Sequence, residues 1–137
     1  MTDDEVRRAV YDGVTRTGRV PLVRELGEGA EEALPRLATA RIFVLQRDSN
    51  EILMAAPFSA VPTPFVVESG GVWYFANCIW DALGIPAMLH RDARIGTSCA
   101  DCGTAAEVSV VDGKVIGEGL LHFAVPARQW WENIVFT

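Results

Sequence analysis

The sequence lacks the segments that would assign it to a membrane or a secreted class of protein. No apolar run reaches the ~18 residues that a membrane-spanning helix needs. The first five residues, Met1 to Glu5, are acidic and lack the basic start and apolar stretch of a secretory signal peptide. We therefore expect a cytoplasmic protein that does not cross a membrane.

Cysteine and histidine are scarce. The three cysteines, Cys78, Cys99 and Cys102, are an odd number, so they cannot all pair as disulfides within one chain. In a reducing compartment such cysteines bind metal, react or lie buried. Cys99 and Cys102 form a single Cys-x-x-Cys pair, and the two histidines, His90 and His122, do not supply a second pair. A closed four-ligand zinc site is therefore not expected.

Basic residues are outnumbered by acidic ones, and the formal net charge is −6. A phosphate backbone requires a basic surface, so nucleic acid is not expected as the main partner. Half of the residues are hydrophobic and 22% are charged, which is typical of a globular protein. A chain of 137 residues predicts one domain, or one domain with a small appendage.

Residues 1–56 have the pattern of a small helical unit. Val6, Val10 and Val14 are spaced for one apolar helix face, and Gly18 is a stop signal. We predict helices over 5–17, 20–26 and 30–40, followed by two short strands over 42–45 and 51–54. Three helices followed by a hairpin is the order of a winged-helix unit.

Residues 57–137 have the pattern of a sheet with short helices, so the predicted fold class is α+β. The three prolines in 57–64 indicate a linker-like stretch without a central strand. Asn77 is the predicted N-cap of a helix over 78–83, which Gly84 and Pro86 would interrupt. The expected sheet is mixed, with strands over 65–67, 72–75, 94–99, 106–111, 115–118 and 120–125. A short helical turn is expected at Trp130-Trp131.

Several short motifs follow one another between Pro57 and Cys102. They are Pro57-Phe58-Ser59, Pro62-Thr63-Pro64, Trp73-Tyr74, Cys78-Ile79-Trp80-Asp81, Pro86-Ala87 and Ser98-Cys99-Ala100. By these motifs the chain resembles the organomercurial (alkylmercury) lyases, whose catalytic core also follows a winged-helix-like unit. The resemblance implies cleavage of a carbon–mercury bond, which gives a hydrocarbon and Hg(II). It implies no required cofactor, since mercury enters as substrate and leaves as product.

Cys78 and Asp81 are the candidate catalytic and metal-binding residues. Mercury is a soft cation, and thiolate is its preferred protein ligand. The start of a helix lowers a thiol pKa, whereas a carboxylate three residues later on the same face raises it. These opposing effects on the thiol pKa suit a thiol and a carboxylate that pass a proton between them. The alternatives are a buried structural cysteine and a solvated helix aspartate.

The resemblance also implies a second catalytic cysteine, which falls in the aromatic-rich segment at 130–137. The best match places it just beyond Thr137, and another match places it at Glu132, so no residue of this sequence supplies it. Cys102 is a third candidate metal ligand, because it would replace that thiol if the fold brought it to Cys78. Trp130-Trp131 would pack, or form a lid over the Cys78 pocket.

Three functions remain open from the sequence. The first is an organomercurial lyase acting on a small organomercury or thiol-bound metal ligand. The second is a noncatalytic mercury-binding or soft-metal-binding protein of the same fold. The third is a winged-helix metal-responsive regulator, although the segment Glu28 to Ala33 is acidic and disfavours DNA. Self-association as a homodimer is expected if a sheet edge is left exposed.

Overall fold

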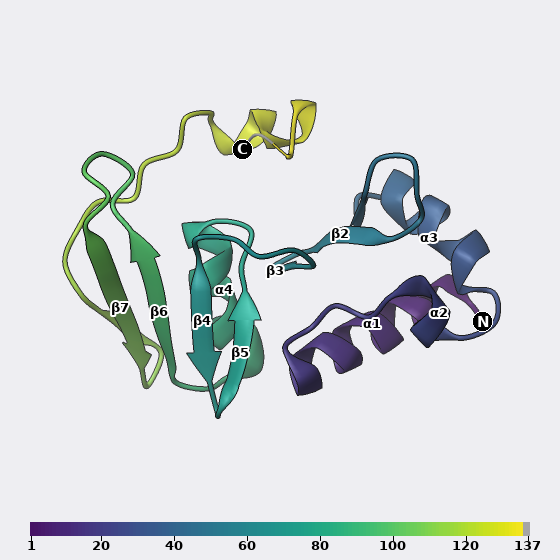
Figure 1. Ribbon diagram of the computed structural model, residues 1–137, viewed down its shortest axis with the longest axis horizontal. Helices are drawn as coiled ribbons and strands as arrows, with labels where there is room; N and C mark the ends of the chain where they lie inside the picture. The colour runs from purple at the N-terminus through teal and green to yellow at the C-terminus, as the bar shows by residue number, and fades with distance from the viewer. Residues whose placement is uncertain (136–137) are drawn as a thin grey trace.

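The computed structural model describes residues 1–135, and its N-terminal part consists of three helices (Figure 1). Helix α1 (Asp3–Thr17) begins with a capping box, in which the Thr2 side chain and the Glu5 side chain bond each other's backbone N–H groups. Its buried face is the predicted row Val6, Val10 and Val14. Gly18 ends the helix in the left-handed conformation, with φ 80°.

Helices α2 (Val23–Leu26) and α3 (Ala30–Thr39) complete this part. Helix α3 continues through Pro35, which cannot donate a backbone hydrogen bond to Glu31 four residues earlier. The carbonyl of Glu31 instead accepts a hydrogen bond from Nδ2 of Asn50, at 3.3 Å. This side-chain donor replaces the bond that the proline removes.

A small antiparallel sheet follows, with strands β1 (Val44–Leu45), β2 (Ile52–Ala55) and β3 (Phe58–Ser59) in that order. The prediction of a linker over 57–64 was therefore wrong at its start. Phe58 and Ser59 are buried and pair with β2. The neighbouring prolines confine β3 to two residues at the edge of its sheet, as the missing N–H of proline requires.

The larger sheet has five strands in the order β5-β4-β6-β7-β8. They are β4 (Val66–Ser69), β5 (Val72–Phe75), β6 (Ala93–Ser98), β7 (Ala105–Val111) and β8 (Lys114–Ile116). Every neighbouring pair is antiparallel, so the prediction of a mixed sheet was wrong. Short turns at Gly70-Gly71 and Asp112-Gly113 join adjacent strands directly, and such turns can only produce antiparallel pairs.

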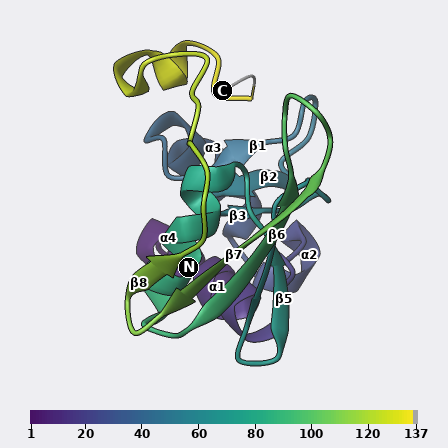
Figure 2. The same cartoon turned by 90° about the vertical axis from the view of Figure 1, so that its left-hand side faces the viewer.

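Helix α4 (Ile79–Leu89) packs against β4 and β6 (Figures 1 and 2). The predicted interruption at Gly84 and Pro86 does not occur. Gly84 packs close to the ring of Pro57, since a Cβ at that position would lie 3.6 Å from the Pro57 Cβ. A glycine costs about 1 kcal/mol and a proline about 3 kcal/mol in a helix interior, and burial of Ile85 and Pro86 offsets these costs.

The C-terminal segment crosses the molecule from the β7 side toward β2 (Figure 1). The predicted strand over 120–125 is absent, and these residues have no regular secondary structure. Leu120 is 99% exposed, so the start of this apolar run joins neither a strand nor the core. The predicted helical turn is confirmed as a 3-10 helix, η1 (Ala127–Glu132).

One hydrophobic core joins the N-terminal helices to the larger sheet. The Tyr74 hydroxyl donates to the carbonyl of Thr15 on α1, and the Tyr11 hydroxyl donates to the carbonyl of Ala56. Phe58 lies between these tyrosines, with its ring centroid 5.3 Å from that of Tyr74. None of the helices within residues 1–135 is long and apolar enough to cross a membrane.

Replacing Phe58 by alanine should lower the free energy of unfolding by about 3–5 kcal/mol, because the ring is fully buried in this core. Urea denaturation followed by circular dichroism measures the change. Val115→Ala on the exposed strand β8 is the control, with an expected change within about 0.5 kcal/mol. Equal effects of the two substitutions would show that Phe58 does not hold the core together.

Candidate functional site

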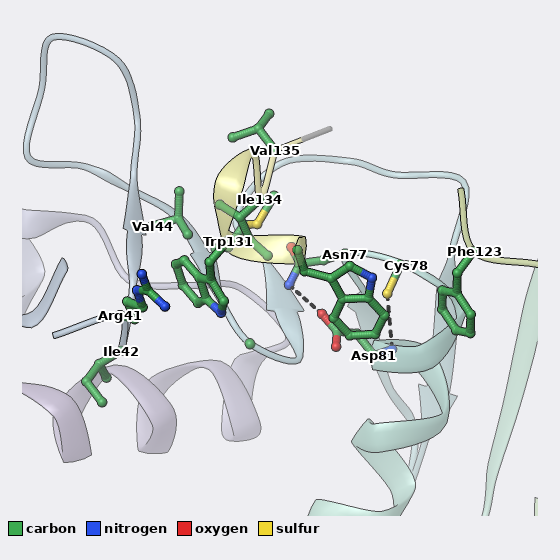
Figure 3. Close-up of a pocket in the computed structure, with 13 residues that line it drawn as sticks. Arg41, Ile42, Val44, Asn77, Cys78, Asp81, Phe123, Trp131, Ile134 and Val135 are labelled. Atoms are coloured by element: carbon green, nitrogen blue, oxygen red, sulfur yellow. Dashed lines mark hydrogen bonds between the residues drawn. The ribbon is translucent and has the colours of Figure 1, made fainter. Parts of the chain in front are cut away.

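A pocket of ≈ 180 Å³ lies between the start of α4, the β1–β2 region and the C-terminal segment (Figure 3). Most of its lining is apolar, and its polar side chains are those of Arg41, Asn77, Cys78 and Asp81. Arg41 and the neighbouring Trp131 lie opposite Cys78 and Asp81 in this view. The structure therefore places the two candidate residues together at one cavity.

Cys78 is the N-cap residue of α4, a position that the sequence analysis had assigned to Asn77. Its sulfur accepts a hydrogen bond from the backbone N–H of Asp81, at 3.5 Å. Burial raises the pKa of the Cys78 thiol, and the nearby Asp81 charge raises it further, against the lowering effect of the backbone N–H groups of Trp80 and Asp81. The expected lowering by the helix start is real but smaller than the effect of burial.

Asp81 is half-buried, and its Oδ2 accepts a hydrogen bond from Nδ2 of Asn77, at 3.0 Å. Burial raises the pKa of the Asp81 carboxyl, although the bond from Asn77 opposes this. Because both pKa values rise, Cys78 and Asp81 hold protons to higher pH than the same groups would in water. A carboxyl and a thiol with this property suit proton transfer inside an apolar pocket.

Asn77 fixes the position of the Asp81 carboxylate. Its Nδ2 also donates to the backbone carbonyl of Phe58, at 3.2 Å, so the amide is held between β3 and α4. Its buried Oδ1 has no hydrogen-bond partner among residues 1–135. The sequence alone does not show this role of Asn77, because it depends on β3 passing beside the start of α4.

Aromatic residues from the C-terminal segment form another wall of the pocket. Phe123 packs between Trp80 and Trp130, at centroid distances of 6.4 and 5.4 Å. The Arg41 guanidinium lies 5.5 Å from the ring centroid of Trp131, on the opposite side. Trp130 and Trp131 line the pocket, at the place expected for residues that pack there or form a lid. The sequence did not predict that Arg41 lines it as well.

Cys102 and Cys99 lie in the turn between β6 and β7, and both are exposed. Neither lines the pocket, so Cys78 supplies its only thiol within the described part of the chain. Glu132, at the end of η1, is exposed and does not line it either. Thr137 lies outside the described residues. No group of three or more Cys, His, Asp or Glu side chains could hold a metal ion within residues 1–135.

The three thiols should differ in their reactivity toward iodoacetamide at neutral pH. Cys102 is exposed and its hydrogen bonding with Thr104 lowers its pKa, whereas burial raises the pKa of Cys78, so Cys102 should react faster. Asp81→Asn should accelerate alkylation of Cys78, because it removes a negative charge that raises the thiol pKa. Peptide mass spectrometry gives the rate for each site. Unchanged Cys78 labelling in that variant would contradict the electrostatic coupling.

An apolar pocket with a half-buried thiol–carboxyl pair, set on an α+β fold with antiparallel sheets, defines a candidate centre for soft-metal chemistry. The family model for alkylmercury lyase (MerB) matches residues 58–137, a range that includes Cys78 and Asp81. The chain therefore belongs to the alkylmercury lyase family.

A solved structure, described as the crystal structure of the mercury-bound form of MerB2, has the same fold. Its sequence is 25% identical and its TM-score is 0.60, over 82% of this chain and 58% of that chain. This chain thus spans less than two thirds of that protein's length. No curated protein matches it.

Proposed function

We propose that this protein binds organomercury compounds through Cys78 and cleaves their carbon–mercury bond by protonolysis, with Asp81 as the proton carrier. The observation that best supports this proposal is that the Cys78 thiol and the Asp81 carboxyl lie together in one pocket. The Cys78 sulfur bonds the Asp81 backbone N–H at 3.5 Å, and both side chains line one apolar pocket. That pocket is built largely from the segment that matches the alkylmercury lyases.

The first step is thiol exchange. The substrate enters as R–Hg–SR′, the Asp81 carboxylate takes the proton of Cys78, and the sulfur of Cys78 bonds mercury. The small thiol leaves as R′SH after it takes up a proton from water. Asp81 is now a neutral carboxylic acid, which its raised pKa favours inside the pocket.

The second step breaks the carbon–mercury bond. A small thiolate adds to mercury, and the electron density this supplies builds up on the carbon bonded to mercury. Asp81 delivers its proton to that carbon, so the bonding electron pair becomes the new C–H bond and R–H leaves. Hg(II) remains on Cys78 and the small thiolate, and Asp81 is again a carboxylate.

The other lining residues have supporting roles in this proposal. The apolar walls, including Ile42 and Phe123, would hold the organic group and limit water near the reacting carbon. Asn77 would orient Asp81 through its bond to Oδ2. Arg41 and Trp131, stacked on the far side, would close the pocket over the substrate.

A noncatalytic mercury binder is the second candidate function. It is favoured by one observation: within residues 1–135, Cys78 is the single thiol that lines this pocket. With one protein thiolate the mercury would carry less electron density, and cleavage would be slow unless a small thiol completes the coordination.

Incubation with a phenylmercury or methylmercury salt and excess small thiol separates these candidates. The lyase releases benzene or methane above the rate of the thiol alone, as measured by gas chromatography. Mercury retained without hydrocarbon, in an amount that falls when Cys78 is replaced by serine, would instead establish the binder. If neither mercury retention nor hydrocarbon is seen, both functions are wrong for this chain.

We also propose that residues 1–56 are a winged-helix-like unit that supports the pocket in 57–137 and does not read DNA. This unit contributes Arg41, Val44 and Met54 to the lining. Its third helix exposes Glu31 and Glu32, and these charges oppose a phosphate backbone. We further propose that the chain forms a homodimer through the exposed edge strand β8.

A further inference from the structure

The turn between β6 and β7 holds two cysteines that the proposed reaction does not use. The two strands pair in register from Ala93–Val110 to Ser98–Ala105, which gives the turn a firm base. The turn itself is closed by two backbone hydrogen bonds of 2.8 Å, from Cys99 N to Thr104 O and from Gly103 N to Cys99 O. The backbone between the two cysteines is therefore fixed before any ligand arrives.

The two sulfurs lie on the same turn and are open to solvent. Cys99 and Cys102 are both free and exposed, and their side chains interact with each other. The Cys102 thiol also hydrogen-bonds the Thr104 hydroxyl, with a sulfur–oxygen distance of 3.1 Å. That hydroxyl is the main cause that lowers the pKa of Cys102, and Cys99 adds to it. A thiolate thus forms more readily here than at the half-buried Cys78, whose pKa burial raises.

We propose that Cys99 and Cys102 form a second mercury-binding site, outside the pocket, that holds one Hg(II) ion through both sulfurs. Two thiolates are sufficient for Hg(II), a soft cation that is stable with two sulfur ligands. A closed zinc site needs four ligands, and residues 1–135 place no third Cys, His, Asp or Glu beside this pair to hold a metal. The donor set therefore selects a soft two-coordinate ion over zinc.

Binding is a ligand exchange without oxidation or reduction. A mercury bis-thiolate, R′S–Hg–SR′, would bond first to Cys102, and one R′SH would leave with the proton of that cysteine. Cys99 then displaces the second thiol in the same way. This second exchange is intramolecular, so it has the advantage of an effective concentration on the order of millimolar or above.

The site would also bind the Hg(II) ion that is released from the pocket after cleavage. This part of the inference rests on the proposed function, because the protonolysis leaves Hg(II) on Cys78 and a small thiolate. An exposed chelating pair would hold the ion more firmly than Cys78 with a free thiol. Binding by the pair itself does not depend on cleavage.

Mercury retention by a cleavage-deficient chain tests the site independently of the proposed function. Cys78→Ser protein is reduced with a phosphine, mixed with HgCl2 and excess glutathione, and desalted. Inductively coupled plasma mass spectrometry should find one Hg(II) per chain, on a monomer. Adding Cys102→Ser or Cys99→Ser should lower the retained mercury by about tenfold or more, because the remaining thiol competes singly with glutathione.

Cys78→Ser with Ser98→Ala is the matched control, since Ser98 is an exposed neighbour of the turn, and it should retain as much mercury as Cys78→Ser alone. The inference would be overturned if Cys78→Ser eluted without mercury. Equal retention after loss of Cys102, mercury-linked dimers in size exclusion, or a Cys99–Cys102 disulfide that persists under the phosphine would overturn it as well.

Discussion

Cys78→Ser should reduce hydrocarbon release from phenylmercury to the rate of the small thiol alone. A serine hydroxyl is not a soft ligand, and it does not ionise near neutral pH, so the pocket loses its bond to mercury. Within residues 1–135 no other thiol lines this pocket to replace it. Gas chromatography of benzene, with the wild-type protein in parallel, measures the loss.

Ala87→Ser is the control for this substitution. Ala87 is exposed on the same helix and does not line the pocket, so this serine should leave the release rate unchanged. Circular dichroism establishes that both variants are folded. Normal hydrocarbon release by Cys78→Ser would show that the thiol does not bond the mercury and that the site assignment is wrong.

Asp81→Asn should slow hydrocarbon release by about 10²–10⁴-fold, the usual contribution of a positioned general acid or base. The amide keeps the size of the side chain but cannot carry a proton to carbon. Retention of mercury on Cys78 should persist in this variant, because the thiol is intact. A variant that loses turnover but still binds mercury at Cys78 would identify Asp81 as a proton carrier and not as a mercury ligand.

Asp12→Asn, on an exposed part of α1, is the matched control and should behave as wild type. Loss of both hydrocarbon release and the mercury bound at Cys78 in Asp81→Asn would indicate a structural or ligand role. A turnover rate close to wild type would mean that the proton reaches carbon from solvent or from a small thiol.

The raised pKa of Cys78 also predicts a direction for the pH dependence. Cys78 and Asp81 must hold one proton between them for delivery to carbon, and that proton is lost as pH rises through the pKa of the thiol. Burial raises this pKa, so release should persist to higher pH than an ordinary thiol would allow. In Asp81→Asn the thiol pKa falls, and residual activity should decline at lower pH than in wild type.

The sequence by itself determined those features that depend on local pattern. The spacing of Val6, Val10 and Val14 predicted the buried face of α1. The Asp112-Gly113 pair predicted the hairpin of β7 and β8. The motif around Cys78 and Asp81 predicted a thiol and a carboxyl near one helix start, because three residues along a helix return to the same face.

Predictions from residue type were wrong where tertiary packing outweighed the local sequence signal. Gly84 and Pro86 are signals for helix interruption, yet burial of Ile85 against the sheet holds α4 together. The apolar run at 120–125 is a strand signal, but it finds no strand partner and stays exposed. In both cases the outcome depended on neighbours far away in the sequence.

Only the tertiary structure decided the chemistry of the site. The sequence showed the helix start that lowers the Cys78 pKa, but burial outweighs it. The pocket around Cys78 is lined by Arg41 and by aromatic residues of the C-terminal segment, which are far from Cys78 in the sequence. The partner of Asp81, Asn77, is held by a carbonyl on β3. The surroundings of a side chain are set by segments that meet only on folding, so its charge state and partners cannot be read from its own neighbours in the chain.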